Sequence, residues 1–171
     1  SSCTYYIDDL SVTEYVPVET ITEAEIPFAL NFEDDVIGVI PEGWIEDSNH
    51  KIEDVTKSSM EVTADGDNKV VKFNQTSTRS SAYYMHYYLE ETDKATLEYK
   101  FKAESNGNYA WLPSFTYNDA DTTKPLYLML MNGGTRVQYS ANCSTWYTAE
   151  SNLTLGEWHT IKLVVNLTEN V

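Results

Sequence analysis

Apolar and polar residues alternate strictly in the run Ala95-Thr96-Leu97-Glu98-Tyr99-Lys100-Phe101-Lys102-Ala103. This period of two is typical of a β-strand with one face on a core and the other in water. The same alternation recurs in residues 161–167 and 71–74, whereas no long stretch repeats its apolar residues with the 3.6-residue period of a helix. The chain is therefore predicted to be all-β.

Further strands are expected near residues 29–32, 51–55, 60–63, 81–89, 109–117, 125–131 and 135–140. Turn-forming sequences rich in Asn, Asp and Gly separate them, at residues 65–68, 106–108, 118–121 and 132–134. Met131 and Thr135 flank Asn-Gly-Gly, which predicts a hairpin at that point. About ten short strands at this spacing indicate a two-sheet antiparallel β-sandwich or jelly roll.

Size and charge narrow the classes of partner. The 171 residues suffice for one domain, and the net charge of −16 argues against nucleic acid and anionic membranes as partners. The acidity serves either solubility or the binding of a cation such as Ca²⁺ through oxygen ligands. Cys3 and Cys143 are the only cysteines, and the sequence leaves open whether they form a disulfide.

The N-terminal part divides into two segments before the domain proper. Residues 1–12 contain a compact strand pattern, Tyr5-Tyr6-Ile7-Asp8-Asp9-Leu10-Ser11-Val12. Residues 13–27 carry Pro17, Pro27 and four glutamates without a core-like pattern, which indicates an extended linker. Residues 28–171 form the expected sandwich domain.

Two motifs resemble those of a known superfamily. Phe32-Glu33-Asp34-Asp35, followed by Gly38 and by Pro41-Glu42-Gly43-Trp44, resembles the opening of concanavalin A-like (laminin-G-like) jelly-roll modules of the carbohydrate-binding type. The run Leu155-Gly156-Glu157-Trp158-His159, with the alternation that follows it, resembles a late strand of the same modules. The resemblance covers residues 30–167 and supports the fold more than a particular ligand.

In that superfamily a closing strand similar to Tyr6–Val12 follows the late strand. The resemblance therefore implies tandem modules, in which residues 1–12 are the tail of a preceding module and this module's own last strand lies beyond Val171. Because a sandwich without its closing strand exposes unpaired backbone groups, residues 6–12 are expected to fill the vacant place. They would do so within one chain or by donation to a neighbouring chain, and the alternative is a strand that simply hangs off.

The resemblance also implies one structural calcium ion. Related jelly rolls hold it between the opening segment and the closing Asp-Asp strand. Glu33 and Asp34 would supply one side here, and Asp9 or Asp8 the other if residues 6–12 complete this sandwich. Acidic turn residues without a metal are the alternative.

Enzyme motifs are missing, because no apolar strand carries carboxylates at i, i+2 and i+4 and no Gly-x-Ser-x-Gly or phosphate loop is present. The sequence predicts a glycan site instead. Aromatic rings can stack on sugars, and neighbouring polar groups can bond hydroxyls or a uronate carboxylate. Residues 83–89 offer such a row on one face, unless this Tyr-rich strand is buried on both sides. Trp44 and Trp158 are expected in the core. The predicted contacts, on one concave sheet and its rim, are Tyr84, His86, Tyr88, Trp111, Arg136, Gln138 and Trp146.

The leading hypothesis is a non-catalytic, extracellular carbohydrate-binding module of a secreted bacterial polysaccharide-active protein, whose catalytic part would be a glycoside hydrolase or a polysaccharide lyase. Its partners would be a polysaccharide and neighbouring modules of the same protein. The alternative is a structural or adhesive repeat of a cell-surface protein. A catalytic jelly roll, with Tyr84, His86 and Tyr88 in a lyase-like site, is a third interpretation.

Overall fold

The computed structural model describes residues 3–14, 28–46, 58–75, 85–86, 94–104, 109–119, 122–131 and 133–166. All regular elements in these ranges are strands, as the alternation predicted, and none of the described residues forms a helix long and apolar enough to cross a membrane. The strands are β1 (Cys3–Glu14), β2 (Phe28–Leu30), β3 (Ile45–Glu46), β4 (Ser58–Asp65), β5 (Asn68–Gln75), β6 (Met85–His86), β7 (Lys94–Ala103), β8 (Tyr109–Trp111), β9 (Thr116–Asp119), β10 (Thr122–Pro125), β11 (Tyr127–Met131), β12 (Arg136–Ser140), β13 (Tyr147–Ser151) and β14 (Trp158–Asn166).

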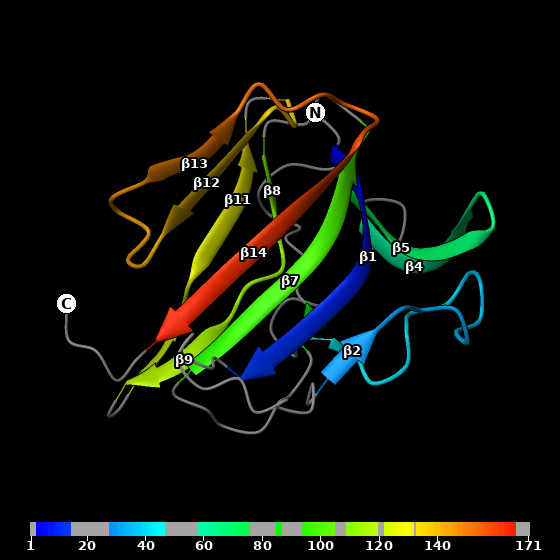
Figure 1. Ribbon diagram of the computed structural model, residues 1–171, viewed down its shortest axis with the longest axis horizontal. Coiled ribbons are helices and arrows are strands. Elements are labelled where there is room, and N and C mark those ends of the chain that lie inside the picture. Colours follow the sequence, from blue (N-terminus) through cyan, green and yellow to red (C-terminus); the bar gives the residue numbers. More distant parts are fainter. Residues whose placement is uncertain are drawn as a thin grey trace, which may run out of the picture.

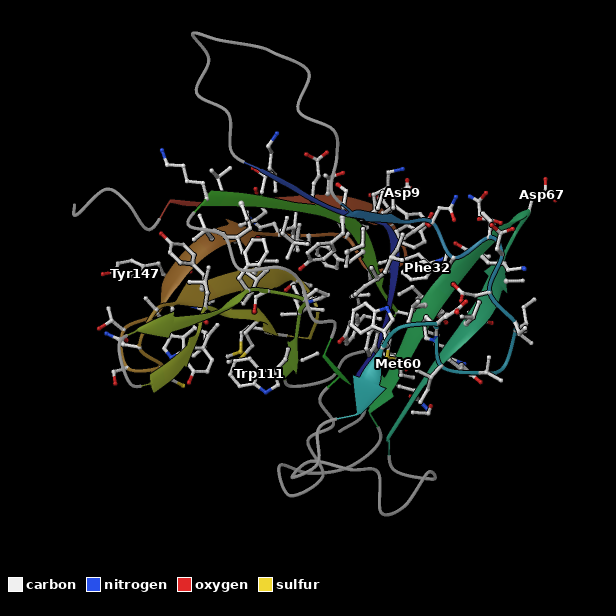
Figure 2. All side chains as sticks on the ribbon, turned by 90° about the horizontal axis from the view of Figure 1, so that it is seen from below. Asp9, Phe32, Met60, Asp67, Trp111 and Tyr147 are labelled. Carbon is white, nitrogen blue, oxygen red and sulfur yellow. The ribbon has the colours of Figure 1, made fainter. Side chains whose placement is uncertain are left out.

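Two antiparallel sheets form the body of the molecule, which confirms the predicted β-sandwich. The larger sheet has the order β14-β7-β1-β5-β4, with β2 paired to β1, and the smaller has the order β13-β12-β11-β8 (Figure 1). Seen edge-on, the sheets stack as two layers with side chains between them (Figure 2). Two short pairs, β10-β9 and β3-β6, lie outside these sheets.

The N-terminal strand completes the larger sheet from within the same chain. β1 pairs antiparallel with β5 through residues 3–7 and with β7 through residues 5–8 and 11–14, so it has neighbours on both sides. The strand runs to Glu14, two residues into the predicted linker, while residues 15–27 lie outside the described ranges. The derivation of residues 1–12 from a preceding module stays a prediction.

A β-bulge in β1 lets two apolar residues reach the core. Asp8 pairs with Lys100 and Ser11 with Glu98, so three steps along β1 oppose two along β7. Asp9 takes up the extra residue in the left-handed region, at φ 50°. As a result Ile7 and Leu10, which strict alternation would place on opposite faces, are both buried.

The core between the sheets is built from the alternating positions. Ile7, Tyr99 and Phe101 of the larger sheet are buried with Leu130 and Val137 of the smaller one. A second cluster of Phe32, Met60 and Val71 lies at the side of the β4–β5 hairpin (Figure 2), and Trp44 packs against both clusters, consistent with its expected place.

Trp158 was expected in the core, and this was wrong. It pairs with Lys102, on the face of the larger sheet that points away from the smaller sheet. Its Nε1 donates to Asp65 Oδ2 at 3.2 Å, and Lys102 Nζ lies 5.1 Å from its ring centroid and 5.0 Å from that of Tyr6. Trp158 therefore covers a buried lysine rather than filling the interior.

The turn predictions are confirmed where the residues are described. The hairpin between β11 and β12 closes with the Gly134 N–H donating to Met131 O at 3.2 Å, and Gly133 and Gly134 have φ 69° and 86°. Only glycine adopts these angles at no steric cost. Gly66, with φ 66°, serves the β4–β5 hairpin in the same way. Residues 51–55 and 106–108 lie outside the described ranges, and of residues 81–89 only β6 lies within them.

Candidate functional site

The smaller sheet turns one face away from the core, and this outer face holds most of the described candidate residues. Ala110, Leu128, Leu130 and Val137 point into the core, so the residues that alternate with them point outward. Figure 2 shows Trp111 on the side of the smaller sheet away from the larger one. The outward positions that define the outer face are Trp111, Tyr127, Met129, Met131, Arg136, Gln138, Thr148 and Ser151.

Three aromatic rings gather on the outer face. The ring centroids of Trp111 and Tyr127 are 5.5 Å apart, and the Trp146 ring lies 6.2 Å from each of them. The rings are tilted to one another by 40° to 56° and each side chain is half-buried. Met129, which pairs with Trp111, is only 9% exposed, although it points away from the core. Trp111, Tyr127 and Trp146 are called the aromatic triad.

Two buried tyrosines of the larger sheet hold the backbone at Trp111. The Tyr5 hydroxyl donates to Trp111 O at 2.8 Å, and the Tyr99 hydroxyl donates to Pro113 O at 3.0 Å. The Leu112 N–H continues the pairing of β8 with a bond to Leu128 O at 2.9 Å. Hydrogen bonds that cross the sandwich therefore fix the strand from which the Trp111 ring projects.

A polar turn positions Trp146. Asn142 Oδ1 accepts the backbone N–H groups of Ser144 and Thr145, both at 2.9 Å, and Ser140 Oγ donates to it at 3.2 Å. Such side-chain bonds to the backbone stabilise tight turns. Cys143 lies in this turn with φ 58° and has a free, exposed thiol.

Polar side chains share the outer face with the triad. Gln138 Nε2 donates to Thr148 Oγ1 at 3.3 Å across β12 and β13. Arg136 lies one outward position before Gln138 on the same strand. Four candidates from different parts of the sequence, Trp111, Arg136, Gln138 and Trp146, thus belong to one surface.

Tyr127 was missed in the sequence. It begins β11 in a run of apolar residues, a composition that predicts a strand but no ligand contact. Its alternation with Leu128 is a signal that Tyr127 faces outward, but its proximity to Trp111 depends on the pairing of β11 with β8, which local sequence does not specify.

The predicted aromatic row at residues 84–88 lies almost wholly outside the described residues. The backbone of His86 belongs to β6, which pairs with β3 through Ile45 and has no pairing with either large sheet. Nothing is described for Tyr84 or Tyr88, or for the His86 side chain. Their contribution to a glycan site stays a prediction.

The turn expected to bind calcium is held by a lysine. Lys69 Nζ donates to the carbonyls of Glu33 at 2.6 Å and Asp35 at 2.8 Å, and the Lys69 N–H donates to Glu33 Oε1 at 3.0 Å. The Asp34 side chain is exposed. The Lys69 ammonium therefore bonds two backbone carbonyls of this turn rather than the Glu33 or Asp34 carboxylate.

On the other side of the predicted calcium site, Asp9 also contacts a lysine. Asp9 Oδ2 is paired with Lys100 Nζ, and within the described residues no three His, Cys, Asp or Glu side chains are grouped to hold a metal ion. In the described residues Glu33 and Asp9 thus contact Lys69 and Lys100. The calcium site stays a prediction and has no part in the function proposed below.

Asp8 gives a testable consequence of this arrangement. Its side chain is buried, and burial, followed by the neighbouring charge of Asp9, raises the pKa of its carboxyl above 3.8. Because its pKa is raised in the folded state, protonated Asp8 contributes stability to the fold. This contribution is fully present below the pKa of the unfolded state and is lost as the pH rises through the pKa of the folded state. The ionised Asp8 therefore costs stability at neutral pH.

We expect Asp8→Asn to raise Tm at pH 7, by the equivalent of up to about 1 kcal/mol, and to match the wild type below pH 3.8. The asparagine oxygen can still accept the Asp9 N–H, as Asp8 Oδ1 does at 2.9 Å. Thermal melts across pH measure this, with Glu98→Gln as the control at a partly exposed carboxylate that pairs with Lys162. A lower Tm for Asp8→Asn at pH 7 would contradict the expectation.

The outer face thus combines three aromatic rings, an amide that bonds across two strands and an arginine on one rigid sheet. Its backbone is fixed from the core by two tyrosine hydroxyls. Comparison with known proteins adds no relative: the chain matches no protein-family model, no curated protein and no solved structure.

Proposed function

We propose that the outer face binds carbohydrate, and that the chain is a non-catalytic binding module of an extracellular, polysaccharide-active protein. The aromatic triad carries this proposal. Pyranose rings expose apolar C–H faces that stack on aromatic rings, while their hydroxyls need polar partners close by. The triad offers both on one surface.

The polar atoms of the triad support the same function. The Nε1–H groups of Trp111 and Trp146 and the Tyr127 hydroxyl have no hydrogen-bond partner among the described residues. They are therefore available to sugar hydroxyls, as is the second N–H of Gln138. Because the rings are tilted by 40° or more, a glycan would contact them in turn rather than lie on one flat platform.

Fluorescence titration tests the proposal directly. Two of the four tryptophans belong to the triad, so adding a panel of neutral and acidic plant cell-wall polysaccharides is expected to change the tryptophan emission. Trp158→Phe removes a tryptophan on the opposite face of the sandwich and should keep the response. No response to any glycan, with no retardation in affinity electrophoresis, would refute a carbohydrate-binding role.

One feature favours the alternative of a structural repeat. Val36, Ile37, Val39 and Ile40 are 41% to 67% exposed, in a segment whose residues Gly38 and Val39 bond the backbone of Val62. A contiguous exposed apolar segment suits contact with a second copy of this module. Sedimentation that shows concentration-dependent dimers, abolished by Ile37→Ser with Val39→Ser, together with a silent glycan panel, would favour that function.

A further inference from the structure

The charge of the outer face departs from that of the whole chain. The chain has 27 Asp and Glu residues against 11 Lys and Arg, yet no outward position of β8, β11, β12 or β13 in the described residues is Asp or Glu. The Glu150 position opposes Val137, which points into the core, and so it does not belong to the outer face. The one charged residue of this face is Arg136.

Arg136 is also exceptional among the described basic side chains. It makes no ion pair or hydrogen bond with the described residues. The lysines with described side chains all have partners: Lys94 makes an interaction with another group, and Lys69 bonds two carbonyls. Four others pair with carboxylates, namely Lys72 with Glu61, Lys100 with Asp9, Lys102 with Asp65 and Lys162 with Glu98. In so acidic a chain, an arginine left without a carboxylate on the same sheet face as three aromatic rings is a feature that solubility does not explain.

From this juxtaposition we infer that the glycan bound by the outer face carries carboxylates, as a polysaccharide of uronic acid residues does, and that Arg136 pairs with one of them. The inference rests on the proposed function and names its substrate class. A planar guanidinium bonds a carboxylate through two parallel N–H···O contacts, which gives both affinity and orientation.

The spacing of the strands fits an oligosaccharide. Trp111 and Arg136 are separated by β11, so their strands lie about 10 Å apart, wider than one sugar ring. The stacked ring and the carboxylate therefore belong to different residues of one glycan chain. A densely sulfated glycan is the less suitable occupant, because it carries more negative charge per sugar than a uronate chain and is repelled more strongly by a chain of net charge −16.

The experiment compares oligogalacturonides with the same oligosaccharides after methyl esterification of their carboxyl groups. The wild type is expected to bind the acid form about tenfold to a hundredfold more tightly. Arg136→Gln should remove this preference by weakening binding of the acid form, whereas Arg136→Lys, which keeps the charge but not the fork of donors, should retain part of it. Thermal melts check that both variants are folded.

The outcomes separate this inference from the proposed function. Equal binding of acid and ester by the wild type, or a preference that survives in Arg136→Gln, overturns the uronate assignment while carbohydrate binding stands. Tighter binding of a sulfated glycan of equal length overturns it as well. No binding of any glycan in the wider panel removes both proposals together.

Discussion

Deletion of residues 1–14 is expected to leave a chain that does not fold. β1 pairs with β5 on one side and β7 on the other, so its loss breaks the larger sheet in the middle. It also removes the buried side chains of Tyr5, Ile7 and Leu10. Emptying one large core position typically costs about 2–5 kcal/mol of unfolding free energy. Losing three such positions therefore removes most or all of the stability of an ordinary domain. Circular dichroism and amide hydrogen exchange of the shortened chain measure the result.

Complementation distinguishes a missing strand from a chain that merely misfolds. A synthetic peptide of residues 1–14 added to the shortened chain should restore a cooperative melt, because the vacant place offers backbone partners on both sides. The same peptide with Ile7→Asp should fail, while one with Thr4→Ser, a half-buried position outside the core, should succeed. A shortened chain that melts at the wild-type Tm on its own would show that the strand is a dispensable overhang.

The fold class could be predicted because alternation is local. The run from Ala95 to Ala103 specifies its inward and outward faces without reference to any other strand, and it became β7. The neighbours of β7 could not be predicted in this way, since pairing depends on contacts far apart in sequence. Trp158 illustrates the limit: it was expected in the core, but its register opposite Lys102 places it on the outer side of the larger sheet.

Most residues of the candidate site could be predicted one by one from the sequence, but only the strand order shows that they share one surface. The sequence marks Trp111 and Trp146 as aromatics near polar turns. It marks Arg136 and Gln138 as outward residues of one strand. Their common surface arises because β11 lies between β8 and β12, which no local pattern reveals. Tyr127 was missed for the same reason, since a tyrosine in an apolar run is ordinary strand composition until its neighbours are known.

Trp111→Ala is expected to weaken glycan binding about 30-fold or more, the loss typical of a central tryptophan in an interface, or about 2 kcal/mol. The ring belongs to the triad at 5.5 Å from Tyr127 and 6.2 Å from Trp146, so its removal also takes one ring contact from each of them and leaves only the Tyr127–Trp146 pair. The fold should survive, because the Tyr5 bond is made to the Trp111 carbonyl, which alanine retains. Isothermal titration measures the affinity.

Trp158→Ala is the matched control, since it removes a half-buried tryptophan from the opposite side of the sandwich and should leave affinity unchanged. A double-mutant cycle of Trp111→Ala and Trp146→Ala then asks whether the triad acts as a unit. Because the two rings are neighbours, their combined loss should be smaller than the sum of the single losses. Full additivity would mean that the two rings contact the glycan independently. Unchanged affinity in both single variants would remove the outer face from glycan recognition altogether, whatever the chain binds elsewhere.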